Sequence, residues 1–364
     1  MPVDTVFVPV DTLQSFMEDV FIGCGISPAE AKICAEVLIT SDLRGIESHG
    51  IGRLKMYYDG IRLGLHKPVT EIEVVSETQT TAVLDGHNGM GHVIGTRAME
   101  MAINKAKTYG MGSVAVRNSS HYGIAGYYAM MAVKAGMIGM SFTNARPSVS
   151  PTFGVRPMLG TNPIAFGAPT DEDCPFVYDA ATSITQRGKI EVLEREEKAI
   201  PEGWVINDKG QYTTDTKAAL AGFPIDKNAL LPLGGLGEMM GGHKGYGLGV
   251  MVEILSASLS HNAFMHHLPG GGGLPVKIGH FFTAINIENF CPLEDFKATT
   301  GGILRDLRGS TRAPGEERIY TAGEKEYENE KRVRIEGIAV NKNLQKDIQV
   351  LQADLGLTKY HFPF

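Results

Sequence analysis

Apolar residues recur at helical intervals near the beginning of the chain. Asp11 is placed to cap a first helix, and Ser27, Pro28 and Glu30 form the capping pattern that opens a second helix. A third apolar stripe ends at Gly64, since glycine commonly terminates helices. The helices predicted here cover residues 11–24, 28–40 and 51–64.

From residue 71 the period changes from that of helices to that of strands. Short apolar runs then alternate with helical stretches, a pattern typical of a mixed α/β lobe. The predicted strands lie near residues 72–74 and over 81–84, 113–116, 137–143, 164–168, 176–178 and 279–287. The predicted helices of this lobe cover residues 91–108, 123–135 and 245–261.

The remaining segments are assigned by polarity. Residues 191–226 are charged and contain prolines, and residues 270–273 are four glycines, so both segments are expected at the surface. Residues 343–355 return to helical periodicity and are expected to pack against the first helices. We therefore predict two lobes: a helical lobe of residues 1–70 with 315–364, and an α/β lobe of residues 71–314.

Composition narrows the class of protein. The chain has 364 residues, 43% of them apolar, and a net charge of −7, so it can bury a core but lacks the basic excess of a nucleic-acid binder. No apolar stretch is long enough to span a membrane and no secretory signal is visible, which makes the cytoplasm the expected compartment. The four cysteines are scattered without metal-binding spacing, so we expect neither a disulfide framework nor a metal site.

A glycine pattern after the second strand resembles a dinucleotide fingerprint. Gly89, Gly91 and Gly95 follow a strand and open a helix, but a third glycine would have to replace Ile94. No acidic residue clearly closes a second strand about twenty residues later. The pattern therefore favours a plain helix-opening turn over a Rossmann nucleotide site.

Two histidine segments are the strongest candidates for chemistry. If a helix opens at Gly50, His49 and Arg53 lie on one of its faces, where the arginine could hold a carboxylate and the imidazole could exchange a proton. The alternative is a capping Ser48 with Arg53 facing solvent. His121 lies between a predicted strand and helix, where functional side chains are often presented, although a structural histidine could also stand there.

Small residues mark a possible cofactor site. Ala180 and Ala181 follow Asp179, and glycines flank Lys244, so a backbone could approach a dinucleotide closely while Lys244 meets its phosphates. Each of these signals is weak alone.

Taken together and in order, these segments resemble the type-2 malate/L-lactate dehydrogenase family, which has sulfolactate, ureidoglycolate and diketogulonate members. The similarity covers nearly the whole chain. The motifs that carry it are DLRGIESHGIGRL from Asp42, SSHYGIAGYY from Ser119, LGTNPIAFGAP from Leu159, YDAATS from Tyr178 with RGKIE, LPLGG with HKGYGL, and APGE from Ala313.

The resemblance implies a fold unrelated to Rossmann dehydrogenases, a homodimer whose contacts involve the helical lobe, and an NAD or NADP site on the α/β lobe. It implies hydride transfer between NAD(P) and a small 2-hydroxy acid, with malate to oxaloacetate as the expected reaction. It assigns His121 or His49 to the proton and Arg53 to the substrate carboxylate, with Ser48 beside it. The implied cofactor contacts are Ala145, Asp179, Ala180, Ala181, Lys244, Gly315, Glu316 and Glu317.

Between the two histidines, we predict that His121 takes the proton, because it belongs to the lobe expected to hold the nicotinamide, while His49 accompanies Arg53. Two features depart from the family pattern: residues 236–241 (LGEMMG) resemble an insertion, and Ala145 replaces a common hydroxyl residue. The alternatives are a reductase of another 2-keto acid or a cyclic imine, or a relative that binds small molecules without catalysis.

Overall fold

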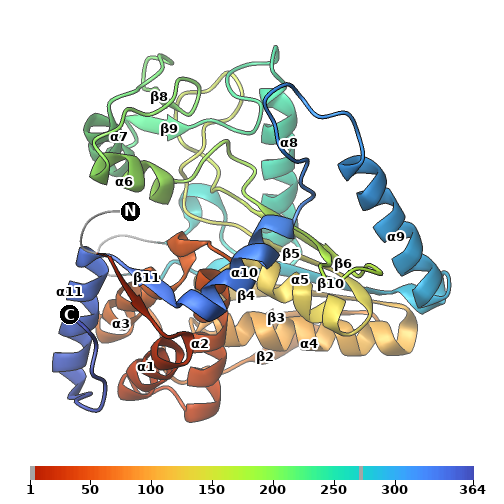
Figure 1. Cartoon of the computed structure of the whole chain (residues 1–364), viewed down its shortest axis with the longest axis horizontal. Helices are drawn as coiled ribbons and strands as arrows, with labels where there is room; N and C mark the ends of the chain where they lie inside the picture. Colours follow the sequence, from red (N-terminus) through yellow and green to blue (C-terminus); the bar gives the residue numbers. More distant parts are fainter. Residues whose placement is uncertain (1–4, 270–273) are drawn as a thin grey trace.

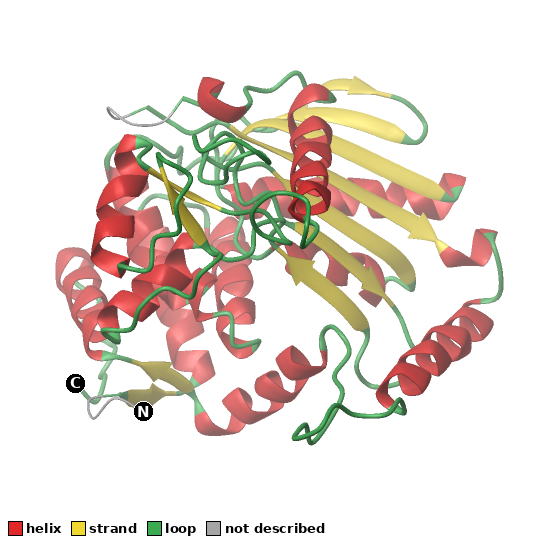
Figure 2. Cartoon of the chain, turned by 90° about the horizontal axis from the view of Figure 1, so that it is seen from above, coloured by secondary structure: helices red, strands yellow, loops and turns green. Residues whose placement is uncertain are grey.

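A mixed seven-stranded sheet forms the centre of the computed structural model, which describes residues 5–269 and 274–364 (Figures 1 and 2). The strand order is β2-β3-β4-β10-β5-β6-β7, and among these described strands only β3 and β4 run parallel. This arrangement confirms the predicted mixed α/β class. The predicted four-glycine surface loop, 270–273, lies outside the described residues. The strands are β2 (Glu73–Glu77), β3 (Thr81–Asp85), β4 (Met111–Ser119), β5 (Met137–Thr143), β6 (Ile164–Ala168), β7 (Phe176–Ala180) and β10 (Ile278–Asn286).

Helices cover both faces of this sheet (Figure 1). On one face, α4 (Gly91–Tyr109) packs against β4 and β10, and α5 (Ala125–Lys134) packs against β5 and β6. On the other face lies α8 (Gly242–Glu253), which continues into a π-helical turn, Ile254–Ser258. These helices fall where the sequence predicted them, because their apolar periodicity is long and regular.

Described segments from the first and last parts of the sequence pack together in a helical lobe beside the sheet (Figure 1). The predicted contact of the last helix with the first ones is confirmed, since α11 packs against α1 and α3. The predicted cap of α1 is wrong: Pro9 occupies the N-cap and Asp11 lies in the first turn. Ser27 does cap α2, accepting a hydrogen bond from the Glu30 amide. The elements are α1 (Val10–Gly23), α2 (Pro28–Leu43), α3 (Leu54–Arg62), α11 (Lys342–Leu355) and the antiparallel pair β1 (Val6–Val8) and β11 (Ile338–Val340).

The polar segment that was expected at the surface is instead a small folded unit. Ile200, Val205 and Ala219 are fully or almost fully buried in a hydrophobic cluster of its own. Its apolar residues are few and interrupted by charges and prolines, which hid the short elements from a periodicity analysis. These elements are α6 (Arg187–Arg195), α7 (Thr216–Gly222), β8 (Val205–Asn207) and β9 (Asn228–Leu230).

Two further helices, α9 (Leu293–Arg308) and α10 (Glu324–Glu336), were not predicted. Ion pairs tie α9 to the loop between β6 and β7, since Arg305 pairs with Asp171 at 2.9 Å and Arg308 with Glu172 at 2.5 Å. Arg308 also pairs with Glu324, the first residue of α10, at 3.4 Å. The loop between α9 and α10 is exposed along most of its length. Within the described part of the chain, no helix combines the length and apolarity needed to cross a membrane.

Candidate active site

The segment that carries His49 and Arg53 does not open a long helix, so the prediction that they share a helix face is wrong. Two 3-10 turns, Glu47–His49 and Ile51–Arg53, precede α3. The buried Asp42 carboxylate accepts a 2.7 Å hydrogen bond from the Ile51 amide. A Cβ at position 50 would lie 1.8 Å from this carboxylate, so only glycine allows the chain to turn there.

His49 and His121 nevertheless meet. Their rings are stacked, with centroids 5.4 Å apart and an interplanar angle of 25°. His121 follows β4 and precedes α5, as the sequence predicted. The first turn of α4 lies against the backbone of His121, and only glycine fits at position 91, because a Cβ there would lie 2.5 Å from the His121 carbonyl oxygen. The glycine pattern that resembled a nucleotide fingerprint therefore serves the contact between α4 and the His121 loop.

Tyr57, which the sequence analysis missed, sets the tautomer of His121. The buried Tyr57 hydroxyl lies 2.5 Å from Nδ1 of His121, and the Gly123 amide donates to the same nitrogen at 3.3 Å. Burial raises the pKa of Tyr57 far above its ordinary value, so the phenol keeps its proton and donates it to its one described acceptor. Nδ1 therefore accepts, and the proton of neutral His121 is on Nε2. Tyr57 stands one helical turn after Arg53 in the sequence, and this spacing could have identified it as a residue of the site.

His49 is held differently. Its Nδ1 lies 2.8 Å from the Ser48 hydroxyl, and either atom can donate in this bond. Ser48 is half-buried, and the Gln186 side chain donates to its hydroxyl at 3.4 Å. His49 can therefore carry its proton on Nδ1 and leave the Nε2 lone pair free, an option that Tyr57 denies to His121.

Charge and burial keep both histidines neutral. Burial, with a smaller contribution from the Arg53 charge, lowers the pKa of His49 to about 4. Burial and the neighbouring His49 lower the pKa of His121 well below its ordinary value. These shifts leave both imidazoles neutral, with the Nε2 lone pair of His49 free to accept a proton and the Nε2 proton of His121 available for a hydrogen bond.

Arg53 is a half-buried cation without a carboxylate partner among the described residues. Its Nε donates to the Ser48 carbonyl at 2.6 Å, which leaves the terminal nitrogens free. A Cβ on Gly188, in the first turn of α6, would lie 3.5 Å from one of these nitrogens. Arg53 lines a hollow that includes Ser48 rather than the His49 pocket, but its charge lowers the pKa of both histidines. A guanidinium without an ion-pair partner is suited to bind an anionic substrate.

A pocket of about 360 Å³ contains His49 and three of the expected cofactor residues, Asp179, Ala180 and Ala181. Asp179 accepts a 2.7 Å hydrogen bond from the Gly126 amide in the first turn of α5, and burial raises its pKa to about 6. The surrounding side chains are small, including Ala125 and Ser183. The pocket therefore has room for a flat ring against backbone.

The other expected cofactor residues are more dispersed. Lys244 is exposed in the first turn of α8, which packs closely on Leu233 at the rim of the histidine pocket. The Ala145 carbonyl lies close to Gly160, the neighbour of pocket residue Thr161. In contrast, Gly315, Glu316 and Glu317 belong to the exposed α9–α10 loop, where residues 309–317 line a separate hollow.

Residues 236–241, which resemble an insertion relative to the family pattern, form a compact loop that leads into α8. A Cβ on Gly234 would lie 2.4 Å from the Gly241 carbonyl carbon, so the loop closes upon itself. Met239 and Met240 at its tip are exposed. Among the residues that the structure describes, no group of three or more His, Cys, Asp or Glu side chains could hold a metal.

Comparisons with known proteins agree with this geometry. The model of the malate/L-lactate dehydrogenase family matches residues 8–349. A malate dehydrogenase of Pyrococcus abyssi is 46% identical over 351 residues, covering 96% of this chain and 95% of the relative. An L-sulfolactate dehydrogenase of Methanocaldococcus jannaschii is 38% identical, covering 93% and 94% respectively.

Solved structures give the same relationship. The crystal structure of malate dehydrogenase from Entamoeba histolytica superposes with a TM-score of 0.96 at 44% identity, covering 99% of this chain and all of that chain. The family match, the identity of the relatives and the shared fold extend over nearly the whole length of the chain. The chain therefore belongs to the malate/L-lactate dehydrogenase family.

Proposed function

We propose that this protein is an NAD(P)-dependent dehydrogenase that oxidises malate to oxaloacetate. The observation that carries the proposal is the contact between His49 and His121, near Arg53, which has no ion-pair partner among the described residues. His49 can carry its proton on either ring nitrogen, whereas the Tyr57 hydroxyl leaves the proton of His121 on Nε2. The names of the relatives at 46% and 38% identity support the substrate class, since malate and sulfolactate are both 2-hydroxy acids.

The groups of the site match the needs of the reaction. Arg53 binds the carboxylate next to the reacting carbon with its planar fork. His121 donates its Nε2 proton in a hydrogen bond to the substrate oxygen, and His49 accepts the hydroxyl proton on Nε2. Ser48 orients the His49 ring through its Nδ1. A nicotinamide, when bound, supplies the hydride acceptor.

The residues near the histidine pocket fit such a cofactor. Asp179, Ala180 and Ala181 line the pocket with His49 and leave backbone accessible, while Lys244 provides a charge suited to phosphates. We assign NAD as the cofactor, with NADP as the alternative. The described cysteines are all free thiols, which suits the cytoplasm as the compartment.

We further propose a homodimer. The face of α8 away from the sheet exposes Leu248, Met251 and Ile254 to 40%, 39% and 53%. A second copy would cover these apolar side chains. It would also complete the cofactor site, since Gly315, Glu316 and Glu317 share no cavity with His49 within one chain.

The direct test is an absorbance assay for reduced nicotinamide with NAD and NADP against malate, lactate, sulfolactate and ureidoglycolate. Malate is expected to give the highest kcat/KM. A higher value for another acid, or activity only in the direction that reduces a cyclic imine, would replace malate by the alternative substrate. Silence with every acid and both cofactors would instead favour a binding protein without catalysis.

A further inference from the structure

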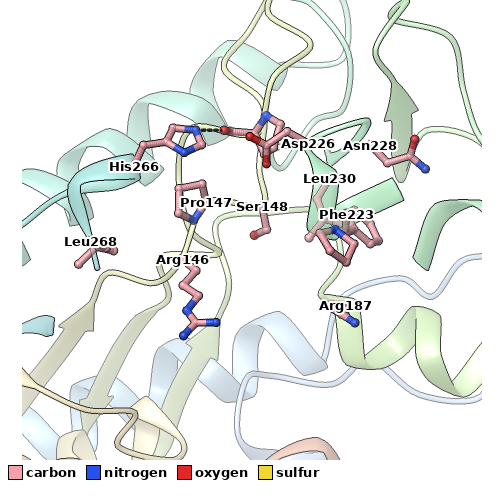
Figure 3. Close-up of a pocket in the computed structure, with 12 residues that line it drawn as sticks. Arg146, Pro147, Ser148, Arg187, Phe223, Asp226, Asn228, Leu230, His266 and Leu268 are labelled. Carbon is pink, nitrogen blue, oxygen red and sulfur yellow. Dashed lines mark hydrogen bonds between the residues drawn. The ribbon is translucent and has the colours of Figure 1, made fainter. Parts of the chain in front are cut away.

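A second cavity, of about 620 Å³, is lined by a separate set of residues from the histidine pocket (Figure 3). Its walls come from the loop after β5, the first residue of α6 and the segment that leads into β9. The cavity contains two arginines, Arg146 and Arg187. Neither arginine is used by the chemistry proposed above.

One side of this cavity is strongly cationic. Arg146 makes no hydrogen bond or ion pair with any described residue, and Arg187 uses only its Nε, which donates to Glu191 at 3.0 Å. Asp226 is the sole acidic residue of the lining, and it faces the exposed Arg156 at 3.5 Å. In Figure 3, Arg146 and Arg187 lie on the lower side of the cavity, with Asp226 on the upper side. Arg146 thus offers unpaired positive charge on the lower side, whereas the charge of Arg187 is partly balanced by Glu191.

One stretch of chain connects the two cavities. The residue before Arg187 is Gln186, which lines the pocket of His49 and donates to Ser48. Residues 183–189 therefore contribute to the walls of both cavities. Ala145, the residue before Arg146, has its carbonyl oxygen 2.6 Å from where a Cβ of Gly160 would lie, and Gly160 precedes the pocket residue Thr161.

A second contact chain links Arg146 to the reactive centre. The pKa of His66 is lowered mainly by burial and, to a smaller extent, by the positive charge of Arg146. The ring of His66 lies 6.3 Å from that of Tyr57, which hydrogen-bonds His121. A substrate bound by Arg53 at one acid group could extend from the histidines toward this cationic wall.

We propose that Arg146, assisted by Arg187, binds the second acidic group of the substrate and selects 2-hydroxy acids that carry a carboxylate or sulfonate on C3. The inference rests on the proposed function and adds to it a substrate class. Malate and sulfolactate, named for the two relatives above, both carry such a group, whereas lactate has a methyl group there. Guanidinium binds carboxylate and sulfonate alike through charge-assisted hydrogen bonds.

The test compares kcat/KM for malate and lactate in the wild type, Arg146→Gln and Arg187→Gln, with Arg97→Gln as the matched control, since Arg97 is an exposed arginine of α4 that pairs with Glu100. Arg146 has no described partner, so its replacement removes no structural contact. We expect Arg146→Gln to lower kcat/KM for malate by about tenfold or more, the usual effect of losing a charged hydrogen bond. The value for lactate should stay within about threefold, and Arg187→Gln should have a smaller effect of the same kind. The control should change neither.

An equal loss for both acids, or no loss for malate, would overturn the subsite. Calorimetric binding of malate and lactate to the same proteins separates this result from a failure of the proposed function. A wild type that oxidises neither acid would refute the function. The subsite would then stand if Arg146→Gln weakened malate binding at least tenfold more than lactate binding, and would fall if the variant did not.

Discussion

Arg53 is proposed to hold the substrate carboxylate, and its charge lowers the pKa of His49. Arg53→Lys keeps the charge but loses the planar fork, so we expect KM for malate to rise about tenfold or more. Arg53→Gln removes the charge as well and should raise the pKa of His49 toward its ordinary value. Steady-state kinetics over a range of pH measures both effects.

The direction of the pH dependence follows from the proton-accepting role proposed for His49. Oxidation needs neutral His49, so kcat/KM should hold through neutral pH and fall only as the pH drops toward the His49 pKa of about 4. This acidic limb should move to higher pH in Arg53→Gln and stay in place in Arg53→Lys. An unmoved limb in both variants, with an unchanged KM, would remove Arg53 from the site.

The two histidines should respond differently to replacement. His49→Asn should lower kcat by on the order of a hundredfold or more and abolish the acidic limb of the pH profile, because it removes the proton acceptor. His121→Asn leaves an amide that can still donate, so it should retain the acidic limb although kcat falls. If His121→Asn loses the limb and His49→Asn keeps it, the roles are those first expected from the sequence.

For single residues, the sequence indicated which side chains are candidates for the chemistry, but not which side chains hydrogen-bond them. His49, Arg53 and His121 were found because their residue types stand in short segments with glycine and serine neighbours. Tyr57 and Asp42 were missed, since each acts through one hydrogen bond that only the folded chain creates. The tautomers, and with them the roles of the histidines, depend on those bonds.

Among the elements, α8 is expected to present Lys244 to the phosphates of the cofactor from its first turn. Lys244→Ala should therefore weaken binding of reduced nicotinamide cofactor about tenfold, with less effect on KM for malate. Lys217→Ala is the matched control, since Lys217 is an exposed lysine in the first turn of α7. Fluorescence titration measures the affinity, and wild-type affinity in Lys244→Ala would exclude this lysine from the cofactor site.

Regular elements were predictable and short ones were not. The bounds of β5 and β6 match their predicted ranges, and α2 and α4 begin at the predicted residues, because a long apolar period or an uninterrupted apolar run is a strong local signal. The third helix begins later than predicted because Asp42, several residues away, holds the preceding turns. The helices α6 and α10 escaped prediction since charged residues dominate them, α9 because two glycines interrupt its centre, and α7 because it is only seven residues long.

For the whole molecule, the apolar face of α8 makes association testable. A charged residue in a desolvated apolar contact is costly, so Met251→Glu combined with Ile254→Glu should convert a dimer to monomer. Light scattering measures the mass, and activity measured in parallel should fall with it if a second copy completes the cofactor site as proposed. A wild type that is a fully active monomer would contradict the dimer.

The central claim is that hydride passes from C2 of malate to a nicotinamide. Malate carrying deuterium on C2 tests it directly, by mass spectrometry of the reduced cofactor formed when the protein is incubated with NAD or NADP. The account predicts one deuterium in each molecule of reduced cofactor. Reduced cofactor without deuterium, or no reduced cofactor at all, would contradict it.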